Sequence, residues 1–452
     1  MESNRLPIRC RAWELCALML AVGSVFTSNF AGADEKAEGD IPAYVGKDSP
    51  VGAWEYGKER GEFWKYRNEK ATATIDGSSV GKYADKLTPG QIALFKAKPG
   101  YRMEIYPAHR VCGVPDFVAA NSEQNRTLAK LDASEEHVVD GVTPGVMFPQ
   151  PKTGAQAIYN FLLRYRGVGT SVPAQVTAVS PRPGSDEWIM AVGPSLNYYP
   201  WAVEGHNKVV GGGAILNGIS FTYVSPAALA GQGGAGKIYF NQVAEAYYYF
   251  TGQRRVRRMP SYQYDAPQLG YENEYLVDET GVFLGPPIDR FNWKLVGKKE
   301  LYVPYNSFGM YRFNAKFDSV FSKSFVNPEF RRYEPHRVYV VEATLKSDAR
   351  HVAHKKVFYL DEDTWIPVLA EDYDAQGNLW KVKEAYPIPV WELGGACDFL
   401  AFTQYDMATG RYVTDQTTIG QGKDVRWFAK ATEPWMKSDY FTSQALQSRS
   451  DR

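Results

Sequence analysis

The stretch KKVFYLDEDTWIPVLAEDYDAQGNLWKVKEAY, residues 355–386, displays the pattern that decides the expected fold. Aromatic and β-branched residues recur in short runs, and the polar groups Asp361-Glu362-Asp363 and Asp374-Ala375-Gln376-Gly377 separate them. Such runs between turn-forming residues predict β-strands joined by tight turns. Because a short turn joins antiparallel neighbours, the stretch predicts a meander within an antiparallel sheet.

The same pattern recurs upstream, and aromatic residues make up 14% of the chain. Further strands are predicted in HRVYVVEATL (336–345), DEWIMAVG (186–193), GISFTYVS (218–225), KIYFNQVAEAYYYF (237–250) and NWKLVGKKELYVPYN (292–306). The expected fold class is α+β, mainly β, with one large curved antiparallel sheet and a few helices.

Helices are predicted mostly in the first part of the chain. Thr88-Pro89-Gly90-Gln91 is a capping box with proline at the first helical position. Thr153-Gly154-Ala155-Gln156 repeats the device. A third helix is expected within residues 114–130. The helix after Thr153 carries an apolar stripe, and Gly167 is expected to cap its end; the stripe is Ile158, Phe161, Leu162 and Tyr165.

The first 33 residues have the three parts of a secretory signal peptide in order. Arg5, Arg9 and Arg11 form a positive region, Leu15–Phe26 an apolar core, and Ala31-Gly32-Ala33 a small-residue cleavage pattern. Cleavage before Asp34 would give an exported, periplasmic protein, although a buried N-terminal helix is the alternative. The expected organisation is then an extended segment over residues 34–80 and a single domain over residues 81–452.

The charge balance argues against a nucleic-acid partner. The chain has 51 basic and 51 acidic residues, so no net positive charge attracts phosphates. Cys112 and Cys397 are the two cysteines after the signal peptide. In an oxidising compartment they either pair or remain two buried thiols.

The segment GQGGAGK, residues 231–237, has the spacing of a phosphate-binding loop. Such a loop requires a Ser or Thr after the lysine for Mg²⁺ and a strand–loop–helix frame. Ile238 occupies that position, and aromatic strand formers follow it. The segment is therefore predicted to be a flexible surface loop, and no nucleotide partner is expected.

Six blocks of sequence resemble a bacterial family of unknown function often labelled outer-membrane lipoprotein-sorting proteins. The blocks are YADKLTPGQIALFKAKPGYRMEIYPAHR, KTGAQAIYNFLLRYRG, GQRRVRRMPSYQYD, DRFNWKLVGKKELYVPYN, RYEPHRVYVVEATLK and KKVFYLDEDTWIPVLAEDYDAQGNLWKV, and they extend from Tyr83 to Val382. The resemblance implies a fold like that of the Lol lipoprotein carriers (LolA and LolB), an incomplete barrel that shelters acyl chains. It also implies RND-type lipid exporters and outer-membrane proteins as partners.

No residue is a clear candidate for catalysis or metal binding, and no cofactor is expected. His351 and His354 are expected on a strand, where residues three apart point to opposite faces, so they are interpreted as surface residues. Asp361 and Asp363 are expected to be solvated in a turn. Cys112 and His109 form only a weak local pair for nucleophilic catalysis.

The candidate ligand-binding residues combine arginines with aromatic rings. The run RRVRR, residues 254–258, is either a solvated strand or a basic rim for an anionic head group. The aromatic side chains either fill the core or line an apolar cavity. The candidates are Arg255, Arg257, Arg164, Arg166, Tyr248, Tyr262, Trp293 and Tyr305.

Three functions are therefore considered. The favoured one is a periplasmic carrier or chaperone for a lipid or another hydrophobic molecule. An exported enzyme on the same scaffold is the second. An outer-membrane β-barrel is the third, but the capped helices, the charged run and the hydrophilic ending SQALQSRSDR disfavour it.

Overall fold

The computed structural model describes residues 54–205, 208–209, 214–240, 242–260, 263–281 and 288–450. The predicted signal peptide, the first part of the expected extended segment and Tyr262 lie outside these residues. Within the described part of the chain, every helix is too short or too polar to span a lipid bilayer.

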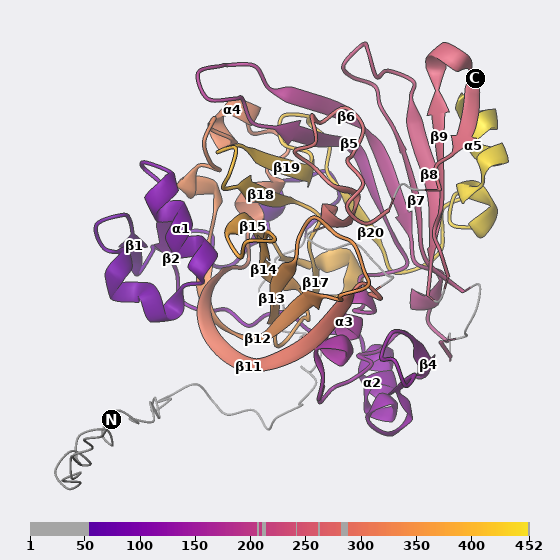
Figure 1. Ribbon diagram of the computed structural model, residues 1–452, viewed down its shortest axis with the longest axis horizontal. Coiled ribbons are helices and arrows are strands. Elements are labelled where there is room, and N and C mark those ends of the chain that lie inside the picture. The colour runs from indigo at the N-terminus through magenta and orange to yellow at the C-terminus, as the bar shows by residue number, and fades with distance from the viewer. Residues whose placement is uncertain are drawn as a thin grey trace, which may run out of the picture. The chain divides into compact units, whose positions relative to one another are not determined.

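One large sheet dominates the described residues (Figure 1). It runs from β1 at one edge to β10 at the other, and neighbouring strands pair antiparallel except for a short parallel contact between β2 and β12. In sheet order its strands are β1 (Ala73–Ile75), β2 (Met103–Ile105), β12 (Tyr333–Leu345), β13 (Lys355–Asp361), β14 (Pro367–Tyr373), β15 (Leu379–Ala385), β18 (Phe402–Asp406), β19 (Tyr412–Thr417), β5 (Gly169–Val179), β6 (Ile189–Tyr198), β7 (Ile215–Thr222), β8 (Gly233–Tyr239), β9 (Glu245–Phe250) and β10 (Arg255–Arg258).

Two further strands pair outside this order, and β11 curves around the lower part of the molecule in Figure 1. They are β11 (Phe291–Pro304), which pairs with β12, and β20 (Arg426–Phe428), which pairs with β5. Two small hairpins complete the strands, β3 (Lys130–Leu131) with β4 (Val138–Asp140) and β16 (Ile388–Val390) with β17 (Ala396–Asp398). The expected mainly β class with a curved, open antiparallel sheet is confirmed.

The meander predicted from residues 355–386 is confirmed as β13, β14 and β15. Asp361 is the last residue of β13, residues 362–366 connect the first two strands, and residues 374–378 connect the second two. Nearly every residue of β13 and β14 is buried. Both faces of this part of the sheet are therefore covered by other elements.

The α-helices lie mostly in the first part of the chain, as predicted. They are α1 (Pro89–Ala97), α2 (Asp116–Leu128), α3 (Gly154–Leu162), α4 (Phe317–Val320) and α5 (Ser443–Ser450). The capping box of α1 is confirmed, because Thr88 Oγ1 accepts from the Gln91 backbone N–H at 3.1 Å and Gln91 Oε1 accepts from the Thr88 backbone N–H at 3.0 Å.

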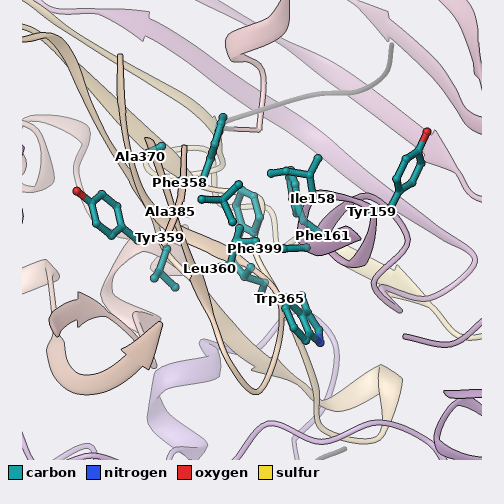
Figure 2. Packing of buried hydrophobic residues seen from close by; sticks show 14 of the residues in the cluster. Ile158, Tyr159, Phe161, Phe358, Tyr359, Leu360, Trp365, Ala370, Ala385 and Phe399 are labelled. Atoms are coloured by element: carbon teal, nitrogen blue, oxygen red, sulfur yellow. The ribbon is translucent and has the colours of Figure 1, made fainter. Parts of the chain in front are cut away.

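The predicted end of α3 is wrong. The helix ends at Leu162, so Tyr165 lies beyond the apolar stripe and Gly167 is not its cap. Directly after the helix, Arg164 and Arg166 turn inward and pair with the buried Asp398. Figure 2 shows the remaining stripe in place: Ile158 and Phe161 lie beside Phe399 within the main core.

Short 3₁₀ helices connect the larger elements. They are η1 (Arg60–Phe63), η2 (Val80–Lys86), η3 (Pro200–Ala202), η4 (Thr251–Gln253), η5 (Val277–Glu279), η6 (Phe308–Tyr311), η7 (Pro328–Phe330), η8 (Trp391–Leu393) and η9 (Ser438–Phe441). η1 anchors the early chain, because the fully buried Arg60 pairs with Glu392 at 2.7 Å and with Asp424 at 3.2 Å.

Candidate functional site

A cavity of about 230 Å³ lies between strands β5–β9 and the segment of residues 263–281, which we call the bridging segment. The bridging segment leaves β10, forms a short hairpin with the bridge Pro267–Leu276, and ends in η5. Because side chains of both the sheet and the bridging segment line the cavity, we call the sheet face beneath this segment the inner face.

The inner face consists largely of small residues where it lines the cavity. Gly234 and Gly236 of β8, Ala246 of β9, and Ala191 and Gly193 of β6 all line it. Residues that are directly paired across antiparallel strands project from the same face. Two rows of paired residues therefore project toward the cavity, and their small residues form its floor. The rows are Ser195–Phe221–Gly234–Tyr248 and Asn197–Ile219–Gly236–Ala246.

The glycines create space that larger side chains would remove. A Cβ atom on Gly234 would come within 2.6 Å of the Phe221 ring, and one on Gly236 within 2.3 Å of the Glu245 carbonyl oxygen. The Phe221 ring thus lies across the backbone of β8. Its centroid is 5.4 Å from that of Tyr223 and 6.3 Å from that of Tyr248, so aromatic rings form one wall.

These positions correct the prediction made for GQGGAGK. Residues 233–237 belong to β8, which pairs with β7 and β9, and only Gly231 and Gln232 precede the strand. The segment is neither a flexible loop nor a loop that opens a helix. Its glycines serve packing, and Lys237 Nζ lies 3.9 Å from the Glu245 carboxylate.

The bridging segment closes the cavity with tyrosines and anchors itself to β19. Tyr264, Tyr271 and Tyr275 line the cavity, and the Tyr275 hydroxyl donates to Asp415 Oδ2 at 2.6 Å. Burial raises the pKa of Asp415, although hydrogen bonds from Thr177, Tyr275, the Gln416 backbone and Gln175 act in the opposite direction. A buried acid held by neutral donors therefore lies at the cavity wall.

Buried ion pairs hold the bridging segment directly after Tyr275, at Asp278 and Glu279. Asp278 Oδ2 lies 2.7 Å from Lys356 Nζ on β13, and Glu279 Oε1 lies 2.7 Å from Lys381 Nζ on β15. Lys383 Nζ lies 2.6 Å from Asp372 on β14. Burial alone would raise the pKa of Asp278, but Lys356 and His351 hold it well below its usual range. We call Asp278, Glu279, Lys356, Asp372, Lys381 and Lys383 the ionic cluster.

The histidines of residues 351–354 differ from the prediction. They lie in the loop before β13 rather than on a strand, and His351 is buried with Nε2 2.8 Å from Asp278 Oδ2, whereas His354 is exposed. His351 was missed because its acidic partner lies far away in sequence. No group of three or more His, Cys, Asp and Glu side chains in the described ranges is arranged to hold a metal ion.

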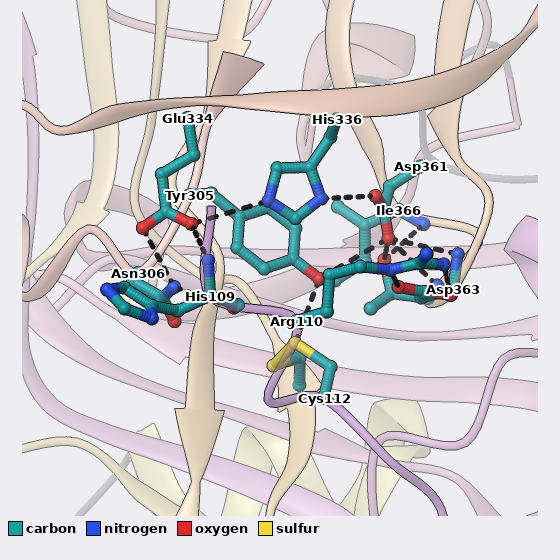
Figure 3. Close-up of a disulfide and its surroundings, with 12 residues drawn as sticks. His109, Arg110, Cys112, Tyr305, Asn306, Glu334, His336, Asp361, Asp363 and Ile366 are labelled. Atoms are coloured by element: carbon teal, nitrogen blue, oxygen red, sulfur yellow. Dashed lines mark hydrogen bonds and ion pairs between the residues drawn. A yellow bond between two sulfur atoms is a disulfide. The ribbon is translucent and has the colours of Figure 1, made fainter. Parts of the chain in front are cut away.

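A second ionic group surrounds the disulfide between Cys112 and Cys397, whose Cα atoms are 5.2 Å apart (Figure 3). The pairing resolves the alternative left open by the sequence. His336 lies between Glu334 and Asp361, and the Tyr305 ring stacks on it at 3.8 Å. Burial alone would lower the pKa of His336, but the hydrogen bonds to Asp361 and Glu334 raise it to about 9.

The prediction that Asp361 and Asp363 are solvated is therefore wrong. Both are buried, Asp361 beside His336 and Asp363 against Arg110 at 2.5 Å. They lie in the predicted turn, but the turn is covered by the chain around Arg110. None of the residues of this group lines the cavity beneath the bridging segment or the smaller cavity next to it.

A smaller cavity of about 40 Å³ adjoins the first. Asn197, Ile238 and Gln416 line both, so their side chains stand between the two. Arg164 and Arg166 line the smaller cavity. Their guanidinium groups pair with Asp398 at 2.9 and 3.1 Å, so they are buried side chains and not part of an exposed rim.

Arg255 and Arg257 are exposed on the edge strand β10. Val256 packs with Tyr249 and Leu446 of α5 on the outer face. Because side chains alternate along a strand, the two arginines project from the inner face, where Arg257 is paired with Tyr248. They extend the floor of the cavity to the sheet edge.

The remaining candidates have different surroundings. Tyr248 lines the larger cavity, and its hydroxyl donates to Gln232 Oε1 at 3.2 Å. Trp293 packs on Phe358 and donates to the Ile288 carbonyl oxygen, and Tyr305 lies beside the disulfide. Trp293 and Tyr305 line neither cavity. The small lining residues of β6 and β9, which are Ala191, Gly193 and Ala246, were not among the candidates. A usable signal for this part of the sheet is the alternation in GISFTYVS, the stretch that forms most of β7, close to the glycines of GQGGAGK.

The chain belongs to the family described as "Protein of unknown function (DUF1329)", whose model matches residues 74–447. The family resemblance noted in the sequence is thereby confirmed. An uncharacterized protein of Pseudomonas aeruginosa is 34% identical over 353 residues, which cover 77% of this chain and 76% of that protein.

Solved structures show weaker similarity. A domain from Vibrio parahaemolyticus described as a "putative outer membrane lipoprotein-sorting protein" has 14% identity and a TM-score of 0.44, over 65% of this chain and 98% of that one. A DUF1329 family protein from Desulfovibrio piger has 13% identity and a TM-score of 0.42, over 64% and 98%. A LolA superfamily protein from Nitrosomonas europaea has 12% identity and a TM-score of 0.36, over 64% and 100%.

Proposed function

We propose that this DUF1329 protein binds a hydrophobic or amphiphilic molecule in the larger cavity and carries it within the cell envelope. The observation that carries the proposal is the floor of glycine and alanine beneath a wall of aromatic rings. Ligand pockets are concave and mostly apolar, with a few placed polar groups. This cavity has that composition, with Asp415, Gln175 and Asn197 among its polar residues.

The bridging segment favours binding over a purely structural role for the cavity. The ionic cluster and the Tyr275–Asp415 hydrogen bond hold the last part of the segment, from Tyr275 to Glu279, against the sheet. Beside these anchors the sheet opposite the segment lacks large side chains at Gly193, Gly234 and Gly236. Tight packing is the rule in protein interiors, so a space of this size beneath an anchored cover suits a guest molecule.

The setting of this activity is proposed from the sequence. The features of residues 1–33 favour export to the periplasm, and the family resemblance favours transfer between inner- and outer-membrane components, with an RND-type exporter as one partner. In this setting Arg255 and Arg257 act at the sheet edge, where their charge attracts an anionic ligand toward the cavity.

Binding of an uncharged hydrophobic probe tests the proposal. The fluorescence of N-phenyl-1-naphthylamine should rise on saturable, one-to-one binding to the purified protein, and 1-dodecanol should displace it. Ala246→Phe places a ring in the cavity and should abolish both signals, whereas Val243→Phe, at an exposed position, should not. Equal signals from wild type and Ala246→Phe would refute binding at this cavity.

A further inference from the structure

The smaller cavity holds a buried positive charge that the described chain does not neutralise. Arg164 and Arg166 share the carboxylate of Asp398, whose Oδ2 also accepts from Trp427 Nε1 at 2.9 Å. Among described residues, Asp398 is the single carboxylate in an ion pair with either arginine. The short internal stretches outside the description contain no Asp or Glu. Two cations therefore face one anion.

Aromatic rings and carbonyls complete the surroundings of the two guanidinium groups. Arg164 lies over the rings of Phe161 and Phe399 and donates to the Phe161 carbonyl oxygen at 3.0 Å. Arg166 lies over the Tyr199 ring. These contacts disperse charge but do not cancel it, and a buried charge without a counterion is unfavourable.

Arg164 also retains an unused donor. Its side chain is 5% exposed, and its Nε has no hydrogen-bond partner in the described structure. Burial and the neighbouring Arg166 lower the pKa of Arg164 to about 10. The residue thus combines an excess of charge, a free N–H and a position on the wall of an adjoining cavity.

We propose that the smaller cavity binds the carboxylate of an amphiphile whose hydrocarbon tail occupies the larger cavity. This inference rests on the proposed function and names its ligand class. A monoanion balances the excess of one positive charge, and the planar guanidinium fork suits a carboxylate. A space of about 40 Å³ holds roughly three water molecules, which is the size of a carboxylate group.

The position between the cavities allows this arrangement. Asn197 and Gln416 offer polar side chains and Ile238 an apolar one where the head would meet the tail. Gln416 lies at an irregularity of the β19–β5 pairing and has φ of 53°. The head group therefore binds inside the protein, and the exposed Arg255 and Arg257 attract the ligand without holding it.

Three matched probes test the inference on the wild-type protein: dodecanoate, 1-dodecanol and dodecyl phosphate, each displacing N-phenyl-1-naphthylamine at pH 8. Dodecanoate should bind at least about tenfold more tightly than 1-dodecanol. Equal affinities would overturn the inference while leaving the proposed function intact, and binding of none of the three would contradict the proposed function itself. Tighter binding of dodecyl phosphate than of dodecanoate would overturn the assignment of a carboxylate.

Two variants locate the head group. Arg164→Gln should reduce the preference for dodecanoate over 1-dodecanol to about twofold or less without weakening 1-dodecanol. Arg258→Gln, which changes an exposed arginine on the opposite face of the edge strand β10, should keep the preference. The opposite pattern would place the head group at the sheet edge and overturn the inference.

A measurement without variants covers the case in which Arg164→Gln does not fold. The carboxyl carbon of ¹³C-labelled dodecanoate bound to wild type should keep the chemical shift of the ionised form at pH values below its ordinary pKa of roughly 4 to 5. Titration of the bound ligand at that ordinary pKa would overturn the inference.

Discussion

Two parts of the inner face contact the bridging segment differently, one through buried ion pairs and the other across a cavity. Beneath one end of the bridging segment, the sheet presents lysines and carboxylates, and the segment inserts Asp278 and Glu279 between them. Beneath its other part, the sheet presents glycine and alanine, and the described chain leaves a cavity there. The polar part therefore holds the bridging segment in place, and the small-residue part leaves the larger cavity beneath it.

The chemistry of each part explains the division. Buried charges need partners at short range, so the ionic cluster holds the segment in one position. Apolar small residues impose no such requirement, so in the proposed function the space above them accepts different tails. On this proposal the affinity for a guest depends on the second part, and the stability of its cover depends on the first.

Breaking the ionic cluster should have the largest effect. Glu279→Ala leaves Lys381 without its buried partner and should lower the free energy of unfolding by about 3–5 kcal/mol. Urea denaturation checks this. The matched control is Lys86→Ala, which removes a half-exposed ion pair with Glu300 and should cost about 1 kcal/mol or less. Similar losses in both variants would contradict the role given to the cluster.

The ionic group at the disulfide lines neither cavity, so its titration should change stability without changing ligand binding. The pKa of His336 is about 9 in the fold against 6.5 for the free side chain. A raised pKa stabilises the fold fully below pH 6.5, and this stabilisation is lost as the pH rises through 9. The loss should be about 3 kcal/mol.

Unfolding free energies at pH 6 and pH 9.5 measure this loss. The loss should be smaller in His336→Gln than in wild type, because the variant lacks the titrating group. Affinity for 1-dodecanol should hardly change over the same range. A parallel fall in stability for wild type and variant would show that His336 is not the source.

Filling the small-residue part should affect binding and not stability. A bulkier side chain that also fills the cavity, Ala246→Trp, should weaken 1-dodecanol binding at least about tenfold while the urea midpoint changes little. Fluorescence displacement and urea denaturation on the same sample separate the two effects. A large loss of stability with unchanged affinity would reverse the roles of the two parts.

The smallest effect is expected at the sheet edge. Arg255→Ala with Arg257→Ala removes two exposed charges and should weaken dodecanoate less than about fivefold, mainly through slower association. Stopped-flow binding at low and moderate salt measures this. An effect that persists unchanged at moderate salt would indicate direct contact with the head group.

The strands were predictable because alternation and turn residues are local signals. KKVFYLDEDTWIPVLAEDYD became β13 and β14, and Thr88 and Gln91 capped α1 as expected. Tyr248 was named as a candidate, but its direction depended on which face α5 covers. That contact joins Leu446 to Tyr249 across a long sequence separation and has no local signal.

Buried charges were the least predictable feature. Lys356 and Lys381 look like solvent-facing residues of a strand, because lysine is rarely buried without a partner. Their partners lie on η5, far away in sequence. Arg164 and Arg166 were interpreted as contributors to an exposed rim for the same reason, since nothing near them in sequence indicates Asp398.

The most direct test of the central claim is native mass spectrometry of the protein purified from its own cells. We expect a complex of one protein with one hydrophobic molecule, which is absent from Ala246→Phe but present in Val243→Phe. A wild-type protein that carries no such molecule and takes up none on incubation with 1-dodecanol or dodecanoate would contradict the account.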